Sequence, residues 1–362
     1  VTMQVFQKKE AVLCGIDEAV AVLKLAAGQY TDYTKAYKLF DQLIDLKSKA
    51  RQQVIGNHKA YVAAIEQKME VSSRLDDLWE SGFEDLKVEV LCDGTRIAPW
   101  ETVMHISGDA SLFAHLETVY LGILARRTKI ASNVRSVVDA ANGKIVLYFP
   151  ARFDHWAVQG GDGYAAHIGG ATGVSTVAQA HWWGAKASGT VPHALIAAVG
   201  GDTVKAITLF GETYPDVDLV ALVDFDNDSV GTSLKCCEAL GDRLWGVRLD
   251  TSNTLVDKSI VPVMQNFKPV GVTPQLVEMT RKALDNSGYG HVKIIVSGGF
   301  NPDRIAEFEK LQVPVDAYGV GSYLMRGVNA FTADVVLLDG RPCAKVGREY
   351  QPNQRLEVVN SR

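Results

Sequence analysis

The chain has 362 residues, of which 47% are hydrophobic and 22% are charged, and its formal net charge is −5. This length suits one large α/β domain with a smaller one, and the composition is that of an ordinary globular protein. The negative balance argues against a general nucleic-acid surface, and no apolar run is long enough to span a membrane.

The five cysteines are scattered and form no Cys-x-x-Cys pair. This spacing fits neither a zinc site nor a disulfide framework, so we expect reduced thiols and a cytoplasmic location. No signal peptide is visible, but Val1 already lies in a predicted strand, so the sequence is compatible with further residues before it.

Residues 1–108 mix strand and helix patterns without regular alternation, which predicts a separate α/β domain. Apolar residues recur at helical intervals, and short alternating runs indicate strands. The predicted helices cover 16–25, 33–53 and 58–81, and the strand pieces cover 5–6, 11–14, 87–91 and 103–106.

Residues 109–325 begin with a long predicted helix, for which Asp109 is the expected N-cap and which continues to about residue 141. Strand and helix patterns then alternate regularly, and the strands are apolar throughout. This favours a parallel sheet covered by helices, either a β/α barrel or an open doubly wound sheet. The predicted strands cover 145–149, 173–176, 219–223, 244–247, 292–296 and 315–318, and the helices cover 193–200, 202–213, 229–240, 274–287 and 302–310.

The tail, residues 326–362, predicts a hairpin with strands at 335–338 and 344–346 around a turn at Asp339-Gly340. These strands are expected to return to the N-terminal domain.

His193 is the most informative single residue, because it lies where a short apolar helix should begin, in the stretch 188–196. A histidine there can accept a phosphoryl group or act as an acid or base, since its pKa lies near neutrality. The alternative is a partly buried histidine that only forms a hydrogen bond. Thr190, three residues earlier, is a further substrate-binding candidate.

Charged residues follow the predicted strands. Asp224 and Asp250 end neighbouring strands, where carboxylates can hold ribose hydroxyls or Mg²⁺. Arg248 leaves the same strand face as Asp250 and can bind a carboxylate, or it can form a structural ion pair with Asp250. Arg152 is a second candidate anion ligand. Asp228 is interpreted as a helix N-cap instead.

Two glycine turns follow the last two strands of this pattern. They comprise Ser297, Gly298 and Gly299, and then Gly319 and Gly321. Without a Cβ, backbone N–H groups can approach a phosphate closely, and the last two such loops of a barrel often bind one. Lys345 in the tail is a further phosphate-binding candidate. The remaining polar and aromatic candidates are interpreted as structural or core residues: His155, His167, His181, Trp156, Trp182 and Trp183.

Taken together and in this order, the motifs resemble the nicotinate phosphoribosyltransferase family, and more distantly the quinolinate enzymes. The matching pieces are Phe149-Pro-Ala-Arg152, Gly189-Thr-Val-Pro-His193, Leu222-Val-Asp224, Val247-Arg-Leu-Asp250, Val296-Ser-Gly-Gly299 and Tyr318-Gly-Val-Gly321. The resemblance implies an irregular β/α barrel plus an N-terminal α/β sandwich that the C-terminal strands complete. It covers nearly the whole chain.

The resemblance also implies an activity. Nicotinate and phosphoribosyl diphosphate would give nicotinate mononucleotide and diphosphate, coupled to hydrolysis of ATP with Mg²⁺, in a homodimer or higher homo-oligomer with shared active sites. His193 would be phosphorylated by ATP, and Arg248 would face the pyridine ring. Asp224 and Asp250 would hold ribose and Mg²⁺, and Arg152 would reach a phosphate.

The sequence departs from the family in four places. Two of them are the arginine motif, which has the form Phe-Gly-x-Arg in the family and reads Phe149-Pro-Ala-Arg152 here, and the cysteine-rich zinc tail of some relatives, which is missing. The aromatic-rich opening is not visible, and an arginine-rich stretch found in some relatives reads Asn253-Thr-Leu-Val-Asp257 here. Two alternatives stay open: a quinolinate phosphoribosyltransferase, for which Arg126, Arg127 and Lys129 could bind the second carboxylate, and a non-catalytic barrel that binds a nucleotide phosphate.

Overall fold

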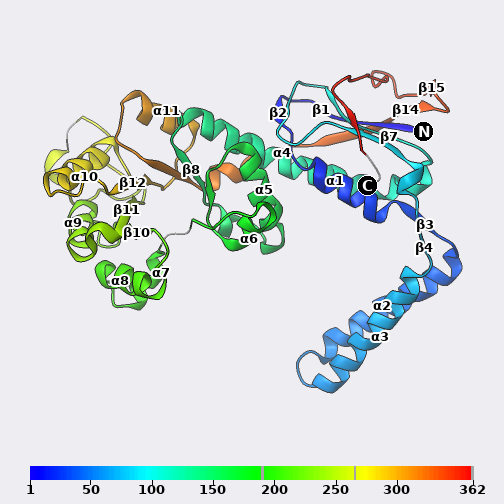
Figure 1. The fold of residues 1–362 in the computed structure, drawn as a ribbon, viewed down its shortest axis with the longest axis horizontal. Helices are drawn as coiled ribbons and strands as arrows, with labels where there is room; N and C mark the ends of the chain where they lie inside the picture. Colours follow the sequence, from blue (N-terminus) through cyan, green and yellow to red (C-terminus); the bar gives the residue numbers. More distant parts are fainter. Residues whose placement is uncertain (189–190, 265, 360–362) are drawn as a thin grey trace.

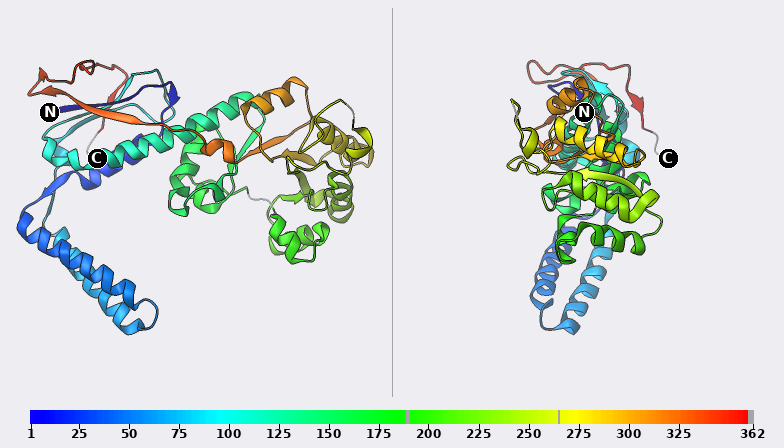
Figure 2. Two further views of the ribbon diagram at one scale, coloured as in Figure 1. Left: turned by 180° about the vertical axis from the view of Figure 1, so that it is seen from behind. Right: turned by 90° about the vertical axis from the view of Figure 1, so that its left-hand side faces the viewer.

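The computed structural model describes residues 1–188, 191–264 and 266–359, so Thr190 lies outside the described residues. A six-stranded parallel sheet with its helices forms one end of the body, and a six-stranded antiparallel sheet forms the other (Figure 1). A helical hairpin extends away from the antiparallel end (Figure 2). The predicted fold class, an irregular barrel beside an α/β sandwich, is confirmed.

The antiparallel sheet joins the two ends of the chain. Its order is β15 (Arg341–Pro342), β14 (Phe331–Leu338), β1 (Thr2–Gln7), β7 (Thr102–Ser107), β5 (Lys87–Val90) and β16 (Glu357–Val358). Strand β1 lies between β14 and β7, so Val5 pairs with Ala333 on one side and with Met104 on the other. The C-terminal strands therefore complete the N-terminal sheet, as the sequence predicts.

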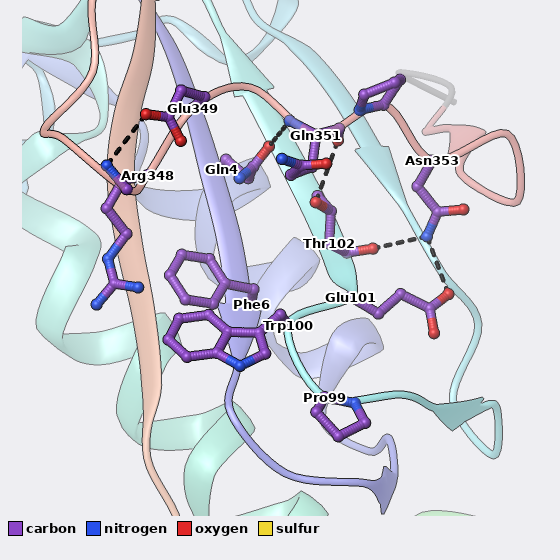
Figure 3. Close-up of a pocket in the computed structure, with 12 residues that line it drawn as sticks. Gln4, Phe6, Pro99, Trp100, Glu101, Thr102, Arg348, Glu349, Gln351 and Asn353 are labelled. Carbon is purple, nitrogen blue, oxygen red and sulfur yellow. Dashed lines mark hydrogen bonds between the residues drawn. The ribbon is translucent and has the colours of Figure 1, made fainter.

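Different elements pack on the two faces of the antiparallel sheet. Met3 and Val5 point toward α1 (Ile16–Ala26) and the first half of α4 (Glu117–Ala140), where they are buried in an apolar core. Alternation along the strand turns Gln4 and Phe6 to the opposite face, and there the tail crosses the sheet (Figure 3).

The tail is held by a hydrogen bond from the Gln351 amide to Gln4 Oε1, 2.7 Å long. Beside it, the rings of Phe6 and Trp100 stack with their centroids 5.6 Å apart, and the Arg348 guanidinium lies over both. Tail and sheet leave a hollow of about 590 Å³ between them, which Figure 3 shows.

The parallel sheet has the order β10 (Leu219–Leu222), β11 (Leu244–Leu249), β12 (Lys293–Val296), β13 (Ala317–Val320), β8 (Ile145–Tyr148) and β9 (Gly173–Val174). It curls as a half-barrel, with β9 and β10 as its edges. Its outer face packs on helices: α8 (Thr203–Thr213), α9 (Ser229–Leu240), α10 (Pro274–Asn286), α11 (Pro302–Lys310) and the second half of α4. Its inner face carries a small cluster around Leu147, Ile295 and Ala317. Because both faces pack on apolar groups, the strands are mostly apolar, with Arg248 of β11 and Lys293 of β12 as charged exceptions.

Helix α4 is shared by both cores. Tyr120 and Leu124 belong to the core under the antiparallel sheet, whereas Ile130 and Val134 belong to the core of the parallel sheet. The prediction that Asp109 caps this helix is wrong, because Asp109 caps the short 3-10 turn Ala110–Leu112. The predicted domain boundary after residue 108 thus precedes a helix that serves both sheets, and it stays a prediction.

The projecting hairpin consists of α2 (Tyr33–Gln53) and α3 (His58–Asp76). Its small separate core includes Leu39, Leu46, Val71 and Leu75. The predicted helix 58–81 is too long, because its last residues form β4 (Trp79–Ser81), which pairs with β3 (Gly28–Tyr30). This ribbon joins the hairpin to the body, and long-range pairing overrides the local helical pattern there.

The tail hairpin turns where the sequence predicts, with Asp339 at φ 47° and Gly340 at φ 74°. Two residues in this conformation make a tight turn that places Arg341 directly opposite Leu338. The second strand therefore starts at once, and the predicted strand at 344–346 is wrong.

Candidate active site

The candidate site lies where the strands of the parallel sheet end. In a sheet of parallel strands all carboxyl ends meet at one edge, which is the usual place for a site in such folds. The predicted residues that follow these ends are Arg152 after β8, Asp224 after β10, Asp250 after β11, Ser297 to Gly299 after β12 and Gly321 after β13.

His193 and Asp224 form a hydrogen-bonded pair. His193 is the first residue of α7 (His193–Ala198), and Asp224 follows β10. The imidazole Nε2 lies 3.0 Å from Asp224 Oδ1, with the His193 side chain 46% exposed and the Asp224 side chain 8% exposed. The pKa of His193 is raised above its ordinary value, first by this hydrogen bond and then by the charges of Asp224 and Asp250. The ring is thus accessible while its acidic partner is buried.

Arg248 and Asp250 leave β11 side by side. A guanidinium Nη2 of Arg248 lies 3.7 Å from Asp250 Oδ2, and the Ser297 hydroxyl donates to Asp250 Oδ1 over 2.7 Å. Burial lowers the pKa of Arg248, while the charges of Asp250 and Asp224 act in the opposite direction. One buried cation therefore lies within electrostatic reach of both predicted carboxylates.

The aromatic ring of Phe149 belongs to the site, although the sequence analysis assigns it no role there. The Arg248 guanidinium carbon lies 5.8 Å from the centre of the Phe149 ring. A Cβ built on Gly319 would lie 2.6 Å from a ring carbon of Phe149, so only glycine accommodates the ring there. An aromatic residue at a strand end next to a glycine-bearing strand end is the signal that could have indicated this contact.

The first glycine turn has the geometry that the sequence predicts for close backbone approach. Gly298 and Gly299 have φ values of 86° and 82°, a region that favours glycine. A Cβ on Gly298 would lie 3.4 Å from Asp250 Oδ1, so the turn lies against the acidic residue of the site. In the part of the chain that the structure describes, neither amide donates to a protein acceptor.

The second glycine turn has a packing explanation for its small residues. Gly319 makes room for Phe149, and a Cβ on Gly321 would lie 3.0 Å from a ring carbon of Phe153. Phosphate binding by Gly319 and Gly321 stays a prediction.

Arg152 and Lys345 lie in different parts of the molecule. Arg152 is exposed, and its guanidinium lies 5.5 Å from the Phe153 ring in the loop after β8. Lys345 is exposed in the tail, where its carbonyl accepts from the Arg348 amide beside the antiparallel sheet. The chain alone therefore does not bring Lys345 to the other predicted phosphate ligands.

Arg126 and Arg127 are bound by carboxylates of their own chain. Arg126 forms two hydrogen bonds with Asp162, 2.8 and 2.7 Å long, and one of 2.6 Å with Asp154. Arg127 lies 2.7 Å from both Glu18 and Asp162, and its side chain is 8% exposed. This network joins α1, α4 and α5 (Gln159–Gly169) and neutralises both arginines.

Three interpretations of individual side chains are settled. The expectation that Trp156 and Trp182 lie in the core is wrong, because they are 79% and 50% exposed on the loops beside α5. Asp228 caps α9, as predicted, by accepting from the Gly231 amide over 3.1 Å.

The donor set for a divalent metal is small. Among the described residues, no group of three His, Cys, Asp or Glu side chains could hold a metal ion. Asp224 and Asp250 fit the lesser requirement of Mg²⁺, which binds one or two carboxylates and takes its other ligands from water and substrate phosphates.

The chain matches two family models: quinolinate phosphoribosyl transferase, N-terminal domain, over residues 30–128, and the C-terminal domain over residues 130–336. A nicotinate phosphoribosyltransferase of Mycobacterium tuberculosis is 28% identical over 252 residues, which cover 67% of this chain and 49% of the relative. A Bacillus subtilis nicotinate phosphoribosyltransferase is 26% identical over 242 residues, 64% of this chain and 44% of the relative. The chain spans about half the length of these relatives.

Solved structures of the same superfamily also match this chain. Nicotinate-nucleotide pyrophosphorylase from Pyrococcus furiosus is 29% identical, with a TM-score of 0.71, covering 99% of this chain and 77% of that one. Human nicotinic acid phosphoribosyltransferase shares the fold, with a TM-score of 0.60 at 15% identity, over 94% of this chain and 71% of that one. Within the described ranges, no helix is both long and apolar enough to cross a membrane. The chain belongs to the nicotinate/quinolinate phosphoribosyltransferase superfamily.

Proposed function

We propose that this protein is a nicotinate phosphoribosyltransferase that acts in the cytoplasm. It forms nicotinate mononucleotide and diphosphate from nicotinate and phosphoribosyl diphosphate, with coupled hydrolysis of ATP. The observation that carries the proposal is the convergence of the His193–Asp224 pair, Arg248, Asp250 and the first glycine turn at one edge of the parallel sheet. The relatives named nicotinate phosphoribosyltransferase support the same choice.

In the transfer step, the lone pair of the pyridine nitrogen forms a bond to C1 of the ribose. The bond from C1 to the diphosphate oxygen breaks, and diphosphate leaves with that electron pair. Positive charge develops on the sugar and negative charge on the leaving group, so fixed charges on both sides stabilise the transition state. Mg²⁺, when bound with the diphosphate, would supply part of the positive charge that stabilises the leaving group.

The residues divide between the two substrates. The Phe149 ring offers a face to the pyridine ring, and Arg248 offers a cation to the pyridine carboxylate, since a guanidinium binds carboxylates well. Asp250 and Asp224 would hold the ribose hydroxyls and Mg²⁺, and the open amides of Gly298 and Gly299 would hold a phosphate.

His193 is the proposed acceptor of the γ-phosphoryl group of ATP. A carboxylate only accepts hydrogen bonds, so the contact with Asp224 keeps a proton on Nε2, and the lone pair of the neutral ring lies on Nδ1. Nδ1 would attack the γ-phosphorus while ADP leaves with the electrons of the broken bond, and water later hydrolyses the phosphohistidine.

The alternative, quinolinate phosphoribosyltransferase, needs cations for a second carboxylate and no ATP. Of the three candidates in the sequence, Arg126 and Arg127 are already paired with Asp162, Asp154 and Glu18. Only Lys129 is left of that set, which favours the monocarboxylate nicotinate.

A homodimer or higher homo-oligomer with shared sites is part of the proposal. Lys345 lies beside the antiparallel sheet, so it would serve as a phosphate ligand only in the site of another subunit. Light scattering, with and without phosphoribosyl diphosphate, measures the assembly.

Product identification tests the proposal. The protein is incubated with phosphoribosyl diphosphate, Mg²⁺ and either nicotinate, quinolinate or nicotinamide, with and without ATP, and products are identified by mass spectrometry. Nicotinate mononucleotide from nicotinate, with ADP formed in parallel, is expected. The same product from quinolinate with release of CO₂ would support the alternative, and binding without turnover would support the non-catalytic barrel.

A further inference from the structure

Arg304 links the first glycine turn to the helices behind it. It lies in the first turn of α11, where Nη1 donates to the Gly298 carbonyl over 2.9 Å and Nη2 donates to the carbonyl of Val272. Gly298 follows β12, and Val272 directly precedes the cap of α10. One side chain thus holds two loops through their backbones.

The Arg304 guanidinium is held in place by aromatic rings. Its central carbon lies 4.2 Å from the centre of the Phe300 ring and 5.7 Å from that of Phe308. Arg304 is partly buried, and this burial lowers its pKa. Hydrogen bonds from a charged donor are strong in such surroundings.

The contact with Gly298 sets the direction of the next amide. All described peptide bonds are trans, and in a trans peptide the carbonyl of one residue and the N–H of the next point in opposite directions. Because Arg304 draws the Gly298 carbonyl toward α11, the Gly299 N–H points away from that helix. Two consecutive glycines lack the Cβ atoms that would otherwise restrict rotation of this peptide.

We infer that Arg304 is a positioning residue for phosphate binding: it fixes the Gly298–Gly299 peptide with its N–H presented to the phosphate of the phosphoribosyl substrate. The inference rests on the proposed function for the identity of the ligand. Without Arg304 the peptide can rotate, and the carbonyl then replaces the N–H and repels the anion.

The test compares Arg304→Gln and Arg304→Lys with Arg281→Gln. Arg281 is a matched control, because it also donates to two backbone carbonyls, those of Val292 and Tyr289, over 2.7 and 3.1 Å, but near the amino-terminal start of β12. Calorimetry measures binding of ribose 5-phosphate, and steady-state kinetics measure KM for phosphoribosyl diphosphate and for nicotinate.

Arg304→Gln is expected to raise the Kd for ribose 5-phosphate about 10- to 100-fold, the effect of losing one charge-assisted hydrogen bond. KM for phosphoribosyl diphosphate should rise in parallel, while KM for nicotinate should change little. Arg304→Lys keeps a cationic donor and should recover part of the affinity, and Arg281→Gln should bind like the wild type even if it is less stable.

Equal affinity in Arg304→Gln and the wild type, or an equal loss in Arg281→Gln, would overturn the inference. So would a wild-type protein that does not bind ribose 5-phosphate at all. If Arg304→Gln does not fold, Arg304→Lys carries the comparison. A fully folded Lys variant that binds ribose 5-phosphate as tightly as the wild type, and in which only KM for nicotinate rises, would also overturn the inference. A wild type that binds ribose 5-phosphate but forms no nucleotide refutes the proposed function, while the comparison of Kd values still decides the role of Arg304.

Discussion

The imidazole Nε2 of His193 lies 3.0 Å from Oδ1 of Asp224. This contact fixes the tautomer of an exposed histidine by means of a buried carboxylate, and it leaves Nδ1 as the nitrogen that the proposed phosphorylation would use. The first two predictions depend on this relationship.

His193→Ala should abolish ATP hydrolysis and the stimulation of nucleotide synthesis by ATP, because the phosphoryl acceptor is gone. Phosphoribosyl transfer without ATP should persist at a reduced rate. The measurement is incorporation of ³²P from γ-labelled ATP into the protein, with acid-labile, base-stable label expected in the wild type only. His291→Ala is the control, since His291 Nε2 also faces an aspartate, 3.9 Å from Asp242 Oδ1. Label on the His193 variant would rule out this acceptor.

Asp224→Asn should move the titration of His193 to lower pH. In the folded protein Asp224 raises the pKa of His193, so the stability that the pair contributes is present below the pKa of an unfolded histidine. It is lost as the pH rises through the higher folded pKa. An attacking Nδ1 must be unprotonated, so the acid limb of the phosphorylation rate should shift to lower pH in the variant. The shift is measured by NMR titration of the ring and by the pH profile of phosphohistidine formation, and an unchanged titration would contradict the role of Asp224.

Phe149→Leu should raise KM for nicotinate about two- to twelvefold, because the loss of an aromatic face over a ring removes about 0.5–1.5 kcal/mol. KM for phosphoribosyl diphosphate should change little, since the first glycine turn is untouched. Steady-state kinetics with each substrate varied in turn separate the two effects, and an equal rise in both values would indicate general disruption instead.

Gly299→Ala should weaken phosphate binding, because a Cβ at φ 82° is strained and would lie 2.8 Å from the Asn253 side chain. Gly327→Ala is a close control: its φ is also 82°, and nothing lies within 4 Å of its added Cβ. Both variants should lose about 1–2 kcal/mol of stability from the left-handed backbone. Only Gly299→Ala should raise KM for phosphoribosyl diphosphate, and a rise in both would mean that strain alone affects the site.

Arg127→Met should lower the free energy of unfolding by about 3–5 kcal/mol, because it leaves the buried carboxylate of Asp162 without one of its two cations. Arg96→Met removes an exposed ion pair to Asp139 and should cost about 0–1 kcal/mol. Urea denaturation measures both values. A loss of less than 1 kcal/mol for Arg127→Met would show that the network contributes little to stability.

Local patterns predicted most of the fold because the strands of the parallel sheet are mostly apolar and apolar residues recur at helical intervals along α2. The sequence could not show that residues 79–81 pair with β3, since this contact joins segments about 50 residues apart in the chain. The expected burial of Trp156 and Trp182 is wrong because hydrophobicity predicts burial only on average, whereas the exposure of these two side chains depends on the loops that carry them.

The candidate site was predictable where residues follow strand ends, and not where distant side chains meet. Asp224, Arg248 and Asp250 could be placed by counting from the strands. The contact of Arg248 with Phe149 depends on the curl of the sheet, which brings β11 toward β8 across two intervening strands. The role of Arg304 depends on which carbonyls its guanidinium reaches, and no spacing in the sequence encodes that.

The position of β1 between β14 and β7 has a consequence for biosynthesis. As the nascent chain leaves the ribosome, β1 and β7 are available early, but the partner on the other side of β1 emerges only after the whole parallel sheet has been translated. The half-barrel can therefore assemble first, while the edge of β1 that later pairs with β14 stays unpaired. An open strand edge is a target for wrong pairing, so chains truncated before residue 331 should aggregate even though they contain every residue of the half-barrel.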